Sequence, residues 1–172
     1  MLRPEVAVAG TALVAVIAMM LAELKRSRSN ERSLRQQGAV EPPDDVYRAM
    51  AVVYPGIFVV MAVEGALTGP TPDRLLIAGF AIFVAAKVLK LWAITALGPR
   101  WCYRVLVLPG APLVSTGPYA FLSHPNYAAV RGEIAGFALM VSAPITGIIS
   151  LAVFALLLRR RIAVEEKALR YT

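Results

Sequence analysis

Residues 117–133 read GPYAFLSHPNYAAVRGE and gather the side chains of this chain that are best suited to chemistry. They contain its single histidine, His124, with a tyrosine on either side of it. Pro125 suits the first turn of a helix, which predicts that His124 or Ser123 lies at the helix N-cap. The free N–H groups of such a helix start attract an anion and favour a neutral imidazole. The segment is a candidate binding site, and a structural or interfacial histidine is the plainer alternative.

Two ionisable residues, Arg131 and Glu133, follow in the next apolar segment. They are two positions apart, so they cannot form a local ion pair on one helix face. Each must find a partner elsewhere or face a polar cavity, and charged residues within a membrane segment are candidates for function. We expect both to contact a substrate, with snorkelling to a nearby interface as the alternative.

In the tail RRRIAVEEK, the spacing of a cation and a carboxylate predicts how their side chains lie relative to each other. Arg161 and Glu165 are four positions apart and share one face if the last helix continues through them. They are either an ordinary surface ion pair or a cation and a carboxylate presented to one pocket. The preceding Arg159 and Arg160 are typical of charges that stop a membrane segment.

The composition indicates a membrane protein and excludes several other classes. The 172 residues are 58% hydrophobic and 17% charged, with a mean hydropathy of +0.65, whereas soluble domains carry about 25% charged residues. The net charge of +7 lies beside apolar runs and does not predict a nucleic-acid partner. With Cys102 as the single cysteine and one histidine, we expect no internal disulfide and no metal site.

Five apolar segments predict one all-α domain, residues 1–172, folded as a polytopic transmembrane bundle. The segments are residues 6–24, 49–67, 75–97, 126–142 and 145–158. A four-span alternative would lay the first segment in the membrane interface.

The distribution of basic residues predicts the orientation of these spans. Residues 25–48, 98–125 and 159–172 carry 6, 2 and 5 Lys or Arg, and all three lie on one side of a five-span arrangement. By the positive-inside rule, that side is cytoplasmic and the N-terminus is outside. Lys87 and Lys90 are expected to snorkel to the inner interface, and Glu64 to lie at the outer one.

The connection 98–125 is too long for a structureless loop of a compact domain. Its prolines fix the backbone, which lowers the entropy lost on ordering it. We expect a folded cap or pocket wall on the cytoplasmic side, together with the start of the fourth span and the tail.

The motifs of the C-terminal half, taken together, resemble the isoprenylcysteine carboxyl methyltransferase family of multispan membrane enzymes. The matching residues are Leu113-Val114, Gly117-Pro118-Tyr119, His124-Pro125-x-Tyr127 and Arg161-Ile162-x-x-Glu165-Glu166. The N-terminal half, with its charged loop AELKRSRSNERSLRQQGAVE, is similar to bacterial alkylpyrone O-methyltransferases. The sequence departs from the family pattern at Ser123, where the family usually has Arg, at Ala111, where it usually has His, and in its short tail.

The resemblance implies S-adenosylmethionine as the cofactor and an oxygen of a lipophilic molecule as the methyl acceptor. The implied catalytic residue is Arg161, which faces the acceptor. The implied cofactor-binding residues are Ala111, Pro112, Leu113, Val114, Tyr119, His124, Pro125, Asn126, Tyr127 and Glu165.

Three functions remain open beside carboxyl methylation. They are alkylpyrone or lipid O-methylation, phospholipid N-methylation, and a non-enzymatic role as a small scaffold or transporter subunit. A transporter would show inverted repeats or broken helices at mid-membrane, and the sequence shows neither. For the methyltransferase we expect a bacterial inner-membrane location, with a polar cofactor arriving from the cytoplasm and the acceptor from the bilayer.

Overall fold

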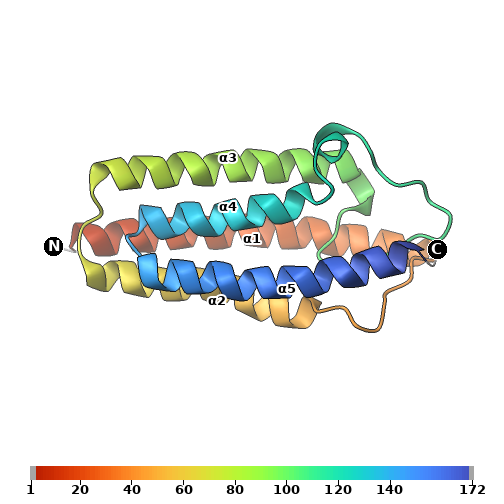
Figure 1. Cartoon of the computed structure of the whole chain (residues 1–172), viewed down its shortest axis with the longest axis horizontal. Helices are drawn as coiled ribbons and strands as arrows, with labels where there is room; N and C mark the ends of the chain where they lie inside the picture. The colour runs from red at the N-terminus through yellow and green to blue at the C-terminus, as the bar shows by residue number, and fades with distance from the viewer. Residues whose placement is uncertain (1–2, 171–172) are drawn as a thin grey trace.

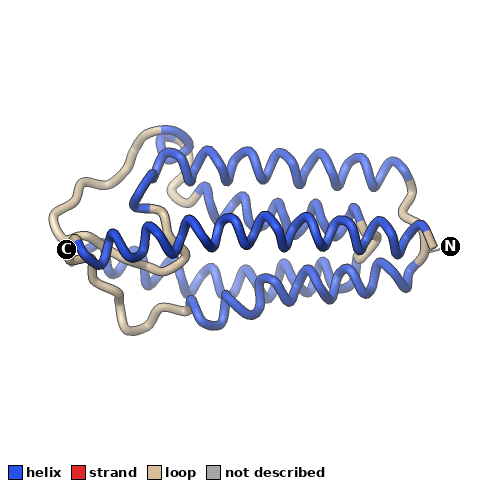
Figure 2. Tube along the Cα trace, turned by 180° about the vertical axis from the view of Figure 1, so that it is seen from behind, coloured by secondary structure: helices blue, strands red, loops and turns tan. Residues whose placement is uncertain are grey.

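The computed structural model describes residues 3–170 as five long antiparallel helices beside one another (Figures 1 and 2). The helices are α1 (Pro4–Gln36), α2 (Tyr47–Thr68), α3 (Asp73–Leu97), α4 (Pro125–Met140) and α5 (Pro144–Arg170). Two short 3₁₀ helices, η1 (Gly98–Arg100) and η2 (Gly117–Ala120), lie in the long connection between α3 and α4. That connection, the α1–α2 loop and the end of α5 meet at one end of the bundle, which we call the loop end.

The predicted all-α bundle is confirmed, and each expected apolar segment corresponds to one helix. Within residues 3–170, three helices are long and apolar enough to cross a membrane, namely α1, α2 and α3 extended through η1. Helix α4 has 16 residues, fewer than the roughly 20 that usually span a bilayer. Helix α1 packs along α2.

Two helices continue beyond their apolar segments. Helix α1 runs past Leu24 to Gln36 because most of its polar residues there are Lys, Arg, Glu or Gln, which are good helix formers, and the chain turns at Gly38, whose φ is +88°. Helix α5 carries the tail to Arg170 without a break. The continuing helix expected for the tail is thereby confirmed.

Helix α4 packs against α2, α3 and α5, and aromatic rings fill its contact with α2. Phe58 and Phe137 are both fully buried, with ring centroids 5.0 Å apart in an edge-to-face arrangement. On the other side, α3 approaches α4 closely at glycines. A Cβ at Gly136 would lie 2.6 Å from the Phe83 nitrogen, and one at Gly79 would lie 2.6 Å from the Met140 nitrogen. This contact fixes α4, and therefore His124 at its start, against α3.

A buried cluster of four charged residues joins α1, α3 and α4. Lys87 Nζ lies 2.9 Å from Glu23 and 3.2 Å from Glu133, and Lys90 Nζ lies 2.6 and 3.3 Å from the same carboxylates. Tyr54 donates a hydrogen bond to Glu133. The two cations and two anions balance, which lowers the free-energy cost of burying each of them.

The expectation that Lys87 and Lys90 snorkel to the interface is wrong. Their side chains are 11% and 2% exposed and turn inward, because Glu23 and Glu133 lie within reach of both ammonium groups. Glu64, expected at the outer interface, accepts hydrogen bonds from the backbone N–H groups of Ile145 and Thr146, at 3.1 and 2.8 Å. It therefore satisfies free donors in the first turn of α5.

Candidate functional site

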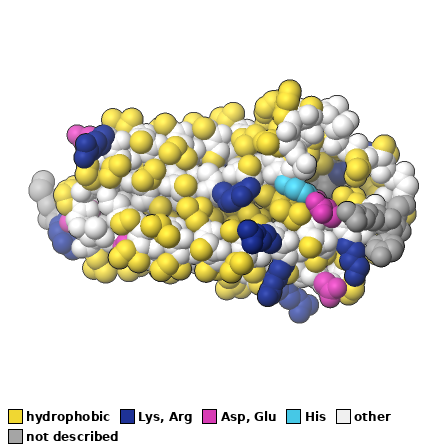
Figure 3. Space-filling model, viewed as in Figure 1, with side chains coloured by type: hydrophobic (Ala, Val, Ile, Leu, Met, Phe, Trp, Pro, Cys, Tyr) yellow, Lys and Arg dark blue, Asp and Glu magenta, His cyan; other side chains and the backbone are white. Residues whose placement is uncertain are grey.

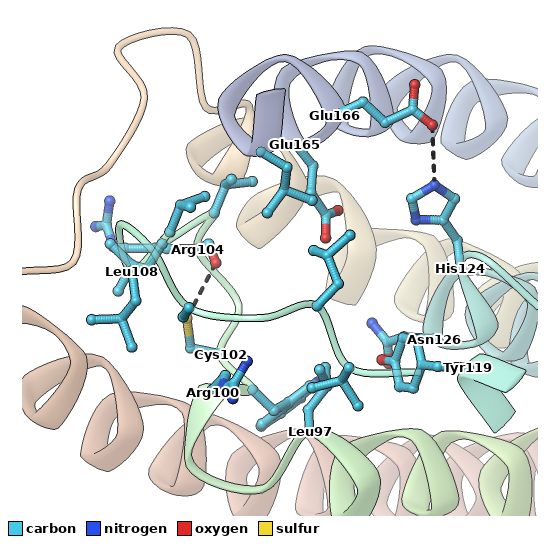
Figure 4. Close-up of a pocket in the computed structure, with 18 of the residues that line it drawn as sticks. Leu97, Arg100, Cys102, Arg104, Leu108, Tyr119, His124, Asn126, Glu165 and Glu166 are labelled. Carbon is cyan, nitrogen blue, oxygen red and sulfur yellow. Dashed lines mark hydrogen bonds and ion pairs between the residues drawn. The ribbon is translucent and has the colours of Figure 1, made fainter. Parts of the chain in front are cut away.

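A pocket of about 460 Å³ opens at the loop end of the bundle. Figure 4 shows the α3–α4 connection wrapped around it, with the start of α4 on one side and the end of α5 above. The α3–α4 connection and the adjoining start of α4 therefore line one cavity together with the end of α5, which is distant from them in sequence.

The start of α4 places His124 at the rim of this pocket. His124 is the N-cap residue, and Pro125 is the first residue of the helix, so the N-cap expectation is confirmed. The His124 carbonyl accepts the Tyr127 and Ala128 N–H groups at 3.1 and 3.2 Å. Its ring stacks on the Tyr127 ring at a centroid distance of 5.3 Å, and its Nε2 lies 3.5 Å from a Glu166 oxygen.

Tyr127 links the two tail residues that share a helix face. Its hydroxyl donates to Glu165 Oε2 at 2.5 Å and accepts a hydrogen bond from Arg161 Nε at 2.9 Å. The shared face of Arg161 and Glu165 is thus confirmed, and both side chains point from α5 to the same residue of α4. The result is a hydrogen-bonded chain of cation, phenol and carboxylate along the pocket wall.

Arg161 is held on its other side by two further groups. The residue is 6% exposed. Its Nη1 lies 3.2 Å from Asp45 Oδ1, and its Nη2 donates to the Tyr103 carbonyl at 2.5 Å. The guanidinium is therefore fixed by partners from three segments, namely the α1–α2 loop, the α3–α4 connection and α4.

The α1–α2 loop braces the pocket wall from behind. Val40 and Val107 exchange two backbone hydrogen bonds, at 2.9 and 3.0 Å, in an isolated antiparallel bridge. Asp45 Oδ2 accepts the Val105 N–H at 2.9 Å. Arg104 pairs with Glu41 at 2.6 Å. These contacts give residues 104–107 of the wall a fixed backbone path.

Further hydrogen bonds hold the two ends of the connection. Asn30 on α1 donates to the carbonyls of Gly98 and Trp101 at 3.2 and 2.7 Å. Arg100 donates to the Pro112 carbonyl at 2.5 Å, across the proline-containing part of the loop. The α3–α4 connection is therefore an ordered wall of the pocket, in agreement with the expected folded cap or pocket wall.

Most residues that the sequence nominated meet at this pocket. Those that line it are Ala111, Pro112, Leu113, Val114, Tyr119, His124, Asn126, Tyr127, Arg161 and Glu165. Pro125 is buried in the first turn of α4 beside the pocket.

The structure places the two nominated substrate residues of α4 elsewhere. Arg131 is exposed on the outer surface of the helix. Glu133 is fully buried in the charge cluster with Lys87 and Lys90. Both lie at least one turn further along α4 than the pocket-lining Asn126 and Tyr127, and their spacing of two puts them on different faces of the helix.

Sequence reasoning missed several pocket residues and the acid behind them. Arg100, Cys102, Arg104 and Glu166 also line the cavity. Asp45 does not line it, yet it holds Arg161. Its only sequence signal is a polar position after Pro42-Pro43, which does not separate it from the neighbouring Asp44.

One pocket residue has an unused hydrogen-bonding atom. Asn126 Oδ1 is buried and has no hydrogen-bond partner within the part of the chain that the structure describes. A buried acceptor without a partner is uncommon because it loses its bond to water without replacement. The pocket is therefore chemically suited to a ligand that brings an N–H donor to Asn126.

Cys102 provides a chemical probe of the pocket. Burial raises the pKa of its thiol to about 11, and only the thiolate is alkylated. At pH 8 we expect iodoacetamide to label it about 200-fold more slowly than the cysteine of an unstructured peptide, whose thiol titrates at about 8.5. The labelling rate should rise about tenfold for each pH unit between 8 and 10. Mass spectrometry measures it, and a rate that levels off near pH 9 would contradict the buried thiol.

A family model described as "Isoprenylcysteine carboxyl methyltransferase (ICMT) family" matches residues 77–171. Two curated relatives match nearly the whole chain. The uncharacterized protein YpbQ of Bacillus subtilis (strain 168) is 33% identical over 92% of this chain and 95% of its own length. An uncharacterized protein of Haemophilus influenzae is 22% identical over 91% of both chains. No solved structure gives a significant match.

Proposed function

Because this chain belongs to the isoprenylcysteine carboxyl methyltransferase family, we propose that it binds S-adenosylmethionine in the loop-end pocket and methylates an oxygen of a lipophilic acceptor. One observation carries the proposal. All but Pro125 of the residues that the family resemblance implies for the cofactor line the same cavity as the arginine that it implies for the acceptor.

The pocket residues fit the proposed cofactor. The cavity of about 460 Å³ falls in the range of about 300–1,000 Å³ that is typical of small-molecule sites. Asn126 Oδ1 is a free acceptor for an amino or adenine N–H, and Glu165 is a carboxylate suited to an ammonium. Leu113 and Val114 supply apolar contacts for a base. When bound, S-adenosylmethionine supplies an electrophilic methyl group on a sulfonium centre.

The residues of this chain would orient the acceptor and exclude water. Within residues 3–170, three of the five N–H donors of Arg161 are engaged, by Tyr127, Asp45 and Tyr103. Two donors remain for an acceptor oxygen. A carboxylate needs no base to be methylated, and an enol of low pKa would be held as its anion by the same guanidinium. Fixed placement of two reactants is therefore the main contribution required of the protein.

The position of the pocket suits reactants of opposite polarity. Figure 3 shows apolar side chains along the bundle, with many of the basic ones toward the loop end. Phe121 and Leu122, beside the pocket-lining Ser123, are 81% and 44% exposed. By the positive-inside rule, the loop end faces the cytoplasm of a bacterial inner membrane. A polar cofactor would arrive from the aqueous side and a lipophilic acceptor from the bilayer.

A labelled-methyl transfer assay tests the chemistry directly. The purified protein in detergent is incubated with S-adenosylmethionine carrying a radioactive methyl group. Three acceptors are compared, namely S-farnesylcysteine (a carboxylate), a long-chain 4-hydroxy-2-pyrone (an enol) and phosphatidylethanolamine (an amine). Arg161 favours the two oxygen acceptors, so we expect label in one of them, and the exposed-residue variant Arg160→Ala should transfer at the wild-type rate. Label only in phosphatidylethanolamine would indicate an N-methyltransferase. No label in any of these or in a bacterial lipid extract would favour a non-enzymatic protein.

A further inference from the structure

Asp45 is the buried acid that faces Arg161 from the α1–α2 loop. Its side chain is 4% exposed. Oδ1 lies 3.2 Å from Arg161 Nη1 and accepts the Tyr47 N–H at 3.0 Å, while Oδ2 accepts the Val105 N–H at 2.9 Å. Both carboxylate oxygens are therefore committed, one to the guanidinium and the first turn of α2, the other to the pocket wall.

This arrangement fixes the guanidinium more tightly than a single ion pair would. Asp45 and the Tyr103 carbonyl engage the two terminal nitrogens of Arg161, and Tyr127 engages Nε. The planar fork of an arginine held at all three nitrogens can neither slide nor rotate, so its remaining N–H groups keep one direction. A buried arginine without an acid beside it would also carry a large desolvation penalty.

We propose that Asp45 is a positioning residue for methyl transfer, which orients Arg161 so that its free N–H groups meet the anionic oxygen of the acceptor. The inference rests on the proposed function. It assigns a role to the α1–α2 loop, which lies outside the residues 77–171 matched by the family model. Asp45 touches neither reactant and acts only through Arg161.

The test compares the binding of the methyl acceptor with the binding of S-adenosylhomocysteine, the product that the cofactor becomes after it has lost its methyl group. Asp45→Asn keeps the size of the side chain and an acceptor oxygen but removes the charge. Asp44→Asn is the matched control, because Asp44 is the adjacent acid and is exposed. S-Farnesylcysteine and the 4-hydroxy-2-pyrone are titrated by tryptophan fluorescence, since Trp101 lines the pocket. S-Adenosylhomocysteine is titrated by calorimetry.

We expect Asp45→Asn to weaken acceptor binding at least tenfold while S-adenosylhomocysteine affinity stays within threefold of wild type. Asp44→Asn should change neither. In an Arg161→Met background the effect of Asp45→Asn on acceptor binding should vanish, because the residue through which it acts is gone.

Three results would overturn the positioning role. They are an unchanged acceptor affinity in Asp45→Asn, an equal loss of both affinities, which a merely structural role predicts, and an undiminished effect in the Arg161→Met background. If the wild type binds S-adenosylhomocysteine but neither acceptor, the role toward an anionic oxygen is also wrong. A folded wild type that fails to bind S-adenosylhomocysteine would instead contradict the proposed function itself.

Discussion

Arg161→Lys is expected to lower kcat/KM for the acceptor by about 100-fold or more, the range seen when a positioned donor to a reacting oxygen is removed. Lysine keeps the positive charge beside Asp45, so the variant should fold. It cannot reproduce three directed hydrogen bonds to Tyr127, Asp45 and Tyr103 and still present donors to a ligand. Labelled-methyl transfer at several acceptor concentrations measures the effect.

Arg160→Lys is the matched control for this prediction. Arg160 is the preceding residue on α5 and is exposed, so its replacement should leave kcat/KM within twofold. S-Adenosylhomocysteine binding to Arg161→Lys should stay within about threefold, because the loss concerns the acceptor. Retention of wild-type transfer by Arg161→Lys would show that a point charge suffices and would remove the guanidinium from the proposed chemistry.

Lys90→Met is expected to lower the free energy of unfolding by about 3–5 kcal/mol, the usual effect of breaking a buried ion pair from one side. The Lys90 side chain is 2% exposed and lies 2.6 Å from Glu23 and 3.3 Å from Glu133. Without it, two buried carboxylates would share Lys87 alone. Reversible unfolding in mixed detergent micelles, followed by circular dichroism, gives the change.

Two comparison variants make this prediction specific. Lys25→Met, at an exposed position of α1, should change the free energy of unfolding by less than about 0.5 kcal/mol. The double variant Lys90→Met/Glu133→Gln restores the charge balance and should be more stable than Lys90→Met alone. If Lys90→Met is as stable as the wild type, Lys90 contributes no net stabilisation through this cluster.

The helices were predictable because each is a local pattern. Apolar runs bounded by prolines, glycines and charges mark all five, and Pro125 marks the start of α4. The pairing of Arg161 with Glu165 on one face follows from their spacing once the helix continues. Such signals need only the neighbouring residues of the chain.

The burial of Lys87 and Lys90 was not predictable in the same way. Whether a lysine snorkels or turns inward depends on an acid from another helix, and Glu23 lies 64 positions away from Lys87. Asp45 poses the same problem, since its partner Arg161 is 116 positions away. Long-range ion pairs depend on how helices pack, and a single sequence does not encode that packing in any local pattern.

The residues that the sequence nominated for the pocket include some that a local pattern places correctly and some whose position depends on how the helices pack. His124, Asn126 and Tyr127 follow one another at a helix start, so finding one of them finds the others. Arg131 and Glu133 were nominated because they are charged within an apolar segment. Their helix face decides their surroundings, and a spacing of two puts at most one of them toward any given site.

The central claim is that the loop-end pocket binds S-adenosylmethionine, and calorimetry on the purified protein in detergent tests it most directly. Wild type is titrated beside His124→Ala and Glu165→Ala, with Arg131→Ala as the control from the outer face of α4. We predict saturable binding by the wild type and by Arg131→Ala, and at least a tenfold loss, about 1.4 kcal/mol, in each of the other two. A folded wild type that binds no S-adenosylmethionine, or variants of His124 and Glu165 that bind it as the wild type does, would contradict the cofactor site.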